Sequence, residues 1–201
     1  MAPVFKEALL DVRPRLLLAG LAVVVLAGWP PSRISPAQAT LYWLYLPVAA
    51  RPAGCAPSAQ EQRIADLMRA HPDQQRPALT CDPILEQVAR ARAQDMADRA
   101  YFSHTNPDGL GPNTLVRQAG YPLPGWYSTA LDGNNIESIA AGPSTADAAW
   151  NLWLGSPGHS THLLGLDPFW AEQIEYGIGF VAKPGSPYTY YWAAITAKRE
   201  P

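Results

Sequence analysis

The chain has 201 residues, a formal net charge of -2 at pH 7 and an isoelectric point near 6.1. This length predicts one domain with a substantial core plus an N-terminal segment, and it is short for two domains. A weakly acidic chain offers no basic field to attract nucleic acid or an anionic membrane surface, so nucleic-acid binding is disfavoured.

The N-terminal region resembles a secretory signal. Residues 16–29, LLLAGLAVVVLAGW, form an uninterrupted apolar run, and the basic residues before it outnumber the acidic ones. A helix needs roughly 20 apolar residues to cross a bilayer, so this run is short for a permanent span. We therefore predict a signal peptide within residues 1–39, with a small-residue cleavage motif at Ala37-Gln38-Ala39.

A lead-in segment at 40–57 separates this signal from the predicted domain at 58–199. It begins with TLYWLYLPVAA, which is apolar and aromatic-rich but has no helical or strand periodicity. An uncleaved anchor, assisted by this interfacial segment, is the alternative to a cleaved signal. Either way the domain is expected outside the cytoplasm, secreted or in the periplasm or cell envelope, or anchored by its N-terminal segment.

The two cysteines, Cys55 and Cys81, both follow the signal. In an oxidising compartment such a pair is expected to form a disulfide. Closing this loop would stabilise the fold by roughly 3 kcal/mol in the chain-entropy view.

Patterning predicts helices first and strands later. A helix is expected from Ser58 to Ala70, a long amphipathic helix from 83 to about 100 after the cap Asp82, a short helix at 113–119, and a helix from Ser144 to the SPG turn at 156–158. NIESIAAG, at 135–142, predicts a short strand, and the runs 176–182 and 189–197 predict a hairpin. No repeating βαβ pattern occurs, so the fold class is α+β, with helices covering an antiparallel sheet.

Four polar residues are candidates for a site. His104 lies in the turn-forming FSHTNPDG, where a loop residue is the plainer interpretation. Glu137 interrupts an apolar strand; facing inward it would need a cationic or hydrogen-bonding partner, and otherwise it lies at an exposed edge. His159 and His162, three apart, can share one helical face, but zinc usually asks for three or four ligands.

The remaining unusual side chains have structural interpretations. His71, in the loop HPDQQRP, is expected at the surface. Trp150 and Trp153 are expected to be core anchors, because aromatics at helical spacing usually lie inside. The chain has no glycine-rich phosphate loop, GxSxG elbow or SxxK motif.

The motifs along the chain are, in order, YFSHTNPDG, NIESIAAG, a tryptophan helix running into SPGH, GIGF and a late aromatic strand. This order of motifs resembles the bacterial branch of the CAP superfamily, the SCP-like extracellular proteins. The resemblance covers about residues 60–197. It implies a three-layer α-β-α sandwich with a cleft that typically holds two histidines and two glutamates.

Residue by residue, the resemblance places the cleft histidines at His104 and His159 and the first glutamate at Glu137, where the family's Glu-Asn-Ile-Ala reads Glu137-Ser138-Ile139-Ala140. Ser156 stands where relatives with a full set keep the second glutamate, and His162 stands where many have asparagine. Ser156 and His162 therefore join the candidate cleft residues. His162 is expected either behind the residues that contact a ligand or at the surface.

The functional expectation is a non-enzymatic extracellular module whose cleft binds a lipid, a peptide or another envelope component. Two imidazoles and a carboxylate are also candidate ligands for a divalent cation such as zinc, held by His104, Glu137 and His159. The alternative is a metal-assisted, protease-like hydrolase in which Glu137 is the base and Ser156 assists. A third possibility is that the three residues only fix loops.

Overall fold

The computed structural model describes residues 54–200. The predicted signal or anchor, and most of the lead-in, lie outside the described residues. The helices are α2 (Ala59–Ala70), α3 (Pro83–Asp98), α4 (Pro112–Gln118), α5 (Ala146–Leu154), α6 (Pro157–Leu164) and α7 (Pro168–Ala171). The strands are β1 (Thr80–Cys81), β2 (Glu137–Ala141), β3 (Glu175–Ala182) and β4 (Tyr190–Ala197).

The strands form one four-stranded sheet in the order β1-β3-β4-β2. The predicted hairpin is present as β3 and β4, and β2 pairs antiparallel with β4. The prediction of a purely antiparallel sheet is wrong in one respect, because β1 pairs in parallel with β3. Sequence patterning missed β1 because two residues are too few to show a period of two.

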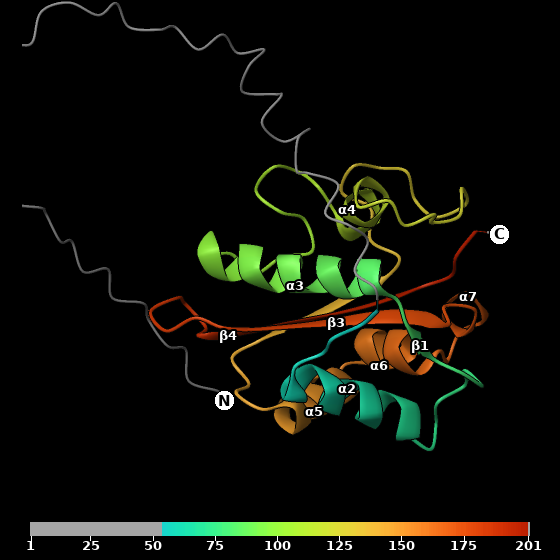
Figure 1. The fold of residues 1–201 in the computed structure, drawn as a ribbon, viewed down its shortest axis with the longest axis horizontal. Coiled ribbons are helices and arrows are strands. Elements are labelled where there is room, and N and C mark those ends of the chain that lie inside the picture. Colours follow the sequence, from blue (N-terminus) through green and yellow to red (C-terminus); the bar gives the residue numbers. More distant parts are fainter. Residues whose placement is uncertain (1–53, 201) are drawn as a thin grey trace, which may run out of the picture. The chain divides into compact units, whose positions relative to one another are not determined.

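Helices cover both faces of this sheet (Figure 1). Helix α3, with α4 beside it, lies on one face, and α2, α5 and α6 lie on the other. Each face has its own apolar cluster, one built around Leu85, Met96 and Ile195 and the other around Ile64, Trp153 and Trp192. The predicted three-layer α-β-α sandwich is confirmed.

Local chemistry sets the helix starts. Ser58 and Glu61 form a reciprocal capping box at α2, and the Asp82 carboxylate accepts from two backbone N–H groups at α3. The predicted start of α5 at Ser144 is one residue early, because the side chain that caps this helix belongs to Thr145. Short α7 was not predicted.

The predicted core and crosslink are both present. Trp150 and Trp153 are buried, and Cys55 is bonded to Cys81, which ties the start of the described chain to β1. Within residues 54–200, none of the helices combines the length and the apolar character needed to cross a bilayer.

Helix α3 approaches β3 closely through two glycines. A Cβ at Gly177 would lie 2.1 Å from the backbone carbon of Leu85, and one at Gly179 would lie 2.2 Å from that of Ala89. Only a residue without a side chain lets the helix backbone come this near the sheet. This contact fixes the height of α3 above the sheet.

Gly177→Ala should therefore lower the free energy of unfolding by about 3 kcal/mol, because the added methyl group overlaps backbone that cannot move alone. Gly125→Ala is the matched control, since a Cβ there has no neighbour within 4 Å. Chemical denaturation of both variants measures the difference. Equal stabilities would contradict the close contact.

Candidate functional site

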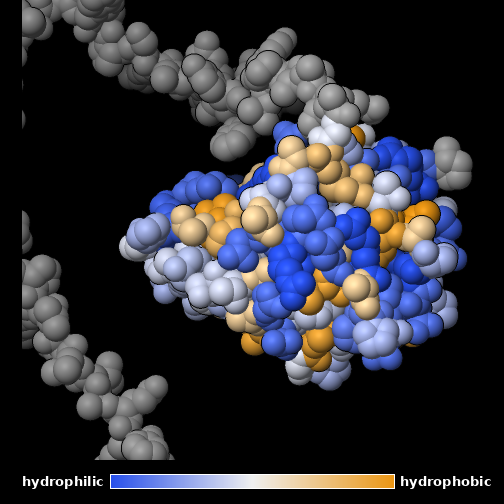
Figure 2. Space-filling view, turned by 60° about the horizontal axis from the view of Figure 1, so that its bottom comes forward, coloured by the Kyte–Doolittle hydropathy of each residue, from blue (hydrophilic) through white to orange (hydrophobic). Residues whose placement is uncertain are grey.

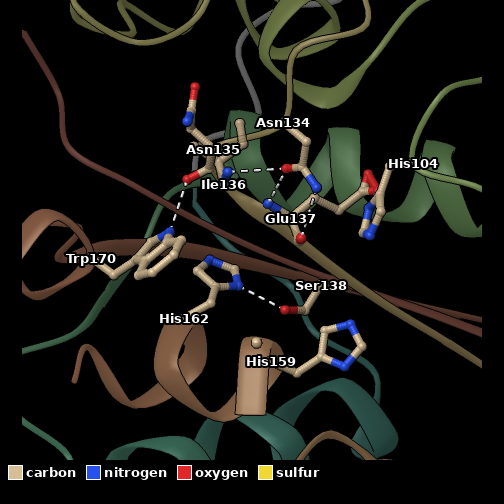
Figure 3. Close-up of a pocket in the computed structure, with 10 residues that line it drawn as sticks. His104, Asn134, Asn135, Ile136, Glu137, Ser138, His159, His162 and Trp170 are labelled. Carbon is tan, nitrogen blue, oxygen red and sulfur yellow. Dashed lines mark hydrogen bonds and ion pairs between the residues drawn. The ribbon is translucent and has the colours of Figure 1, made fainter. Parts of the chain in front are cut away.

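A pocket of about 250 Å³ brings the predicted triad together. Figure 3 shows His104 on one side, His159 on the other, and Glu137 and Ser138 of β2 between them. His162 and Trp170 complete the inner wall. Ser156 is not among the lining residues; it is the N-cap residue of α6, and its side chain makes no capping hydrogen bond.

The pocket lies at the edge of the sheet. Strand β2 is an edge strand, and successive side chains of a strand point to opposite faces. Glu137 reaches Arg92 in the α3 layer, whereas Ser138 reaches His162 in α6. A pocket that touches both Glu137 and Ser138 must therefore open at the strand's edge, where loops from both helical layers meet.

Glu137 is fully buried and paired. Its Oε1 accepts from Arg92 Nε at 2.9 Å and its Oε2 from Arg92 Nη2 at 3.3 Å; the two side chains are 0% and 2% exposed. Burial alone would lower the pKa of Arg92, but the Glu137 carboxylate outweighs it and raises that pKa above its ordinary value. The cationic partner required of an inward Glu137 is thus Arg92.

Arg92 lies within the long amphipathic helix predicted from 83 to about 100, and no role was predicted for it from the sequence. Its position was a usable signal, because Val88, Arg92 and Met96 follow one another at four-residue intervals along the face that packs on the sheet. Arg92 also donates to the carbonyl oxygens of Ser103 and His104, at 2.8 and 2.9 Å. It therefore holds both the carboxylate and the loop that carries His104.

The ring of His104 stands between this ion pair and the pocket. Its Nδ1 is buried without a hydrogen-bond partner among the described residues and lies 3.5 Å from Glu137 Oε2, while the side chain as a whole is 39% exposed. The carboxylate favours the tautomer with the proton on Nδ1, which leaves the Nε2 lone pair for a ligand. Glu137 accordingly orients His104, and its own oxygens face Arg92.

His159 is half-buried in the opposite wall. Burial lowers the pKa of its imidazole, and nearby His104 lowers it further. The ring is therefore neutral at pH 7, the form in which imidazole binds metal ions.

The ligating atoms of the triad do not form a closed cluster. In residues 54–200, the one group of three ligating atoms within 4.8 Å of one another is Cys55, Cys81 and Glu86, and there the two cysteines form a disulfide. His104, Glu137 and His159 line the same pocket at wider spacing.

His162 is 4% exposed, so of its two predicted positions the surface is wrong, and its burial at the pocket agrees with the other. Its Nδ1 lies 2.7 Å from Ser138 Oγ and its Nε2 lies 2.7 Å from Thr196 Oγ1. Thr196 donates its one hydroxyl proton to Gln173 Oε1 at 2.6 Å, so it must accept from His162 Nε2–H. His162 Nδ1 is then an acceptor, and Ser138 donates to it.

Burial lowers the pKa of His162 to about 3, and the charge of Arg76 contributes. This imidazole stays neutral under physiological conditions and serves as a hydrogen-bonding core residue. The participation of Ser138, Thr196 and Gln173 was missed, because nothing in the spacing of these residues along the chain indicates that they meet.

His71 is more enclosed than predicted. Its side chain is 20% exposed, and its ring packs against Trp150 with the ring centroids 6.0 Å apart. It lies away from the His104 and His159 pocket and lines a separate hollow with Arg63 and Leu67.

An α-β-α sandwich with two histidines facing each other across the edge of its sheet defines an SCP-like domain. The sequence profile of the cysteine-rich secretory protein family, CAP, matches residues 62–194. The chain belongs to this family, and the resemblance found in the sequence is confirmed.

Relatives and solved structures agree with this assignment. The uncharacterized protein YkwD of Bacillus subtilis is 32% identical over 134 residues, covering 66% of this chain and 46% of that protein. The chain thus spans about half of that relative's length.

Two solved structures share the fold. An extracellular protein containing an SCP domain from Bacillus anthracis matches with a TM-score of 0.52 and 27% identity, over 70% of this chain and 40% of its own. An outer surface protein of Borrelia burgdorferi matches with a TM-score of 0.54 and 17% identity, over 72% of this chain and 97% of its own.

The neutral, buried His162 predicts a loss of stability in acid. Its folded pKa is lower than that of the unfolded chain, so its contribution is complete above about pH 6.5 and is lost as the pH falls toward 3, by roughly 3 kcal/mol at pH 4. Urea denaturation at several pH values measures this. His162→Gln should flatten the slope in this range, and an unchanged slope would contradict the assignment.

Removing one partner of the buried ion pair should be costly. Arg92→Met leaves the Glu137 carboxylate buried beside His104 alone and should lower the free energy of unfolding by about 3–5 kcal/mol. The double variant Arg92→Met with Glu137→Leu should recover much of that loss, because no unpaired charge is left. Denaturation experiments measure the free energies of unfolding. If the effects of the two substitutions on this free energy simply add, the pairing is refuted.

Proposed function

We propose that this protein acts outside the cytoplasm as a non-enzymatic binding module. Its ligand site is the pocket between His104 and His159, and its ligand is a lipid, a peptide or a divalent cation of the cell envelope. The secretory-type apolar run at 16–29 supports the location. The names of two relatives in structure, an extracellular protein and an outer surface protein, support it as well. Secretion, retention in the envelope and anchoring through the N-terminal segment all satisfy this proposal.

The pairing of Glu137 with Arg92 carries the preference for binding over catalysis. A general base needs a carboxylate that can take a proton from substrate or water, and this one is buried against a guanidinium through both oxygens. His104 and His159, in contrast, both line the pocket, and the side chain of His104 is 39% exposed.

The donor set fits a weakly held divalent cation. His104 Nε2 and His159 would supply two imidazole ligands, and water would fill the other positions, whereas a tight zinc site uses three or four protein ligands. Glu137 would act on such an ion through His104, since carboxylates commonly orient metal-binding histidines. A bound cation would add a positive charge that attracts and polarises an oxygen of the ligand.

The alternative, a metal-assisted hydrolase, retains one supporting observation. Ser138 donates to His162 at 2.7 Å inside the pocket, which is the contact a nucleophile makes with its base. Two facts weigh against it: Ser138 is only 1% exposed, and the pKa of His162 is lowered to about 3, which makes the imidazole a poor base. Zinc-dependent peptide cleavage that is lost in Ser138→Ala would favour this alternative.

Zinc binding tests the proposal at the two histidines. Titration calorimetry at pH 7 should give one weak site, and His104→Ala or His159→Ala should abolish it. Glu137→Gln should weaken zinc binding by about tenfold without abolishing it, as expected of an orienting residue. His71→Ala is the control, because this histidine lies outside the pocket. Equal binding by wild type and the His104→Ala/His159→Ala double variant would exclude the pocket.

A further inference from the structure

The free edge of β2 continues from the pocket and carries unpaired backbone groups. Thr196 N donates to Ile136 O and Gly142 N donates to Tyr190 O, each at 2.9 Å. In an antiparallel ladder the residues that face the partner strand alternate, so Ser138 and Ala140 also face β4. The N–H and C=O groups of Glu137, Ile139 and Ala141 therefore point away from the sheet.

One of these three positions is already closed. The side chain of Asn134 accepts from Glu137 N at 2.9 Å and donates to Glu137 O at 3.2 Å, just as a neighbouring strand would do. Figure 3 shows this contact beside the pocket. No such contact reaches the outward N–H or C=O of Ile139 or Ala141 from elsewhere in residues 54–200.

Solvent reaches the strand at this edge. Glu137 as a residue is 5% exposed although its side chain is 0% exposed, so its exposed surface belongs to the backbone. Ile139 as a whole residue is 5% exposed and Ala141 is partly exposed, whereas Ser138 and Ala140, whose backbone faces β4, are each 1% exposed. The space-filling view in Figure 2 shows polar and apolar side chains mixed over the face that it presents.

This edge has few of the protections that edge strands usually carry. Natural sheets discourage pairing by short edge strands, by bulges, and by charged side chains or prolines on the edge strand. β2 has no proline, and its single charged side chain, Glu137, is buried against Arg92. What limits pairing here is the short length of the strand and the Asn134 contact at one end.

From this geometry we infer that the cleft takes an extended peptide, which adds to the sheet as a strand beside Ile139 and Ala141 and reaches the pocket with one end. An extended backbone is the chemical complement of alternating outward N–H and C=O groups. The inference rests on the proposed function in treating the cleft as the binding region, and it selects a peptide from the ligand classes proposed there. With two residues available for pairing, affinity is on the order of millimolar.

Amide hydrogen exchange followed by NMR on the full 201-residue chain tests this inference. The probe is the blocked peptide acetyl-Lys-Thr-Val-Thr-Val-Thr-Lys-amide at about four times its dissociation constant, which is a concentration of several millimolar. It should slow exchange of the Ile139 and Ala141 amides by about fivefold. An analogue with the same side chains and N-methylated central amides should leave both amides unchanged, because it cannot form the ladder.

A matched pair of variants separates backbone pairing from side-chain contact. Ala141→Pro removes an outward N–H that β4 does not use, so the sheet should persist while the peptide no longer protects Ile139. Ala141→Val keeps that N–H and should retain the effect. A circular dichroism spectrum matching wild type confirms that the proline variant is folded.

Several results would overturn strand addition. These are no protection at either amide, equal effects of the two peptides, or protection that rises with protein concentration alone, which would make a second copy of the chain the occupant. If zinc binds the pocket and the peptide protects neither amide, strand addition fails and the proposed pocket function stands. If the peptide protects both amides and the pocket histidines bind nothing, only the pocket function fails.

Discussion

The buried ion pair between Arg92 and Glu137 is the contact on which the arrangement of the site depends. It joins the middle of helix α3 to the first residue of edge strand β2, two segments 45 residues apart. The same guanidinium holds the carbonyl oxygens of Ser103 and His104. Arg92 thus connects the helix, the strand and the loop that supply one wall of the pocket. A buried ion pair of this kind adds little net stability, but breaking it leaves an uncompensated charge, so it specifies one arrangement.

The opposite wall is held by hydrogen bonds between neutral side chains. Ser138, His162, Thr196 and Gln173 form a chain in which each hydroxyl and ring nitrogen has one consistent role. An ion pair therefore holds the wall on the α3 side, and hydrogen bonds between neutral groups hold the wall on the α6 side. The pocket between them is lined by two imidazoles, while its carboxylate is paired with Arg92, and this difference is the basis of the proposed binding role.

The position of the site at a sheet edge has a further consequence. Most strands in the core have both backbone edges paired, and only an edge strand can offer its N–H and C=O groups to another chain. Asn134 closes that edge beside the pocket and leaves it open two residues further on. A single asparagine side chain thus marks the boundary between the histidine pocket and the proposed strand-pairing site.

Much of the fold was predictable because its signals are local. The capping residues Ser58 and Asp82, the stripe of α3, the hairpin and the paired cysteines each act over a few residues or through a single chemical preference. Where local signals were absent, elements were missed, as with the two-residue strand β1 and the short helix α7. Where they were ambiguous, as between Ser144 and Thr145, the predicted start of α5 was one residue early.

The sequence alone determined the family, the sandwich class and the candidates His104, Glu137 and His159. It could not decide what each of them does. That Glu137 faces Arg92, that His162 is buried and neutral, and that Ser156 lies outside the pocket follow from tertiary packing. The physical reason is that burial and pairing of a polar group depend on which distant segments cover it, and the spacing of residues along one chain carries no record of that contact.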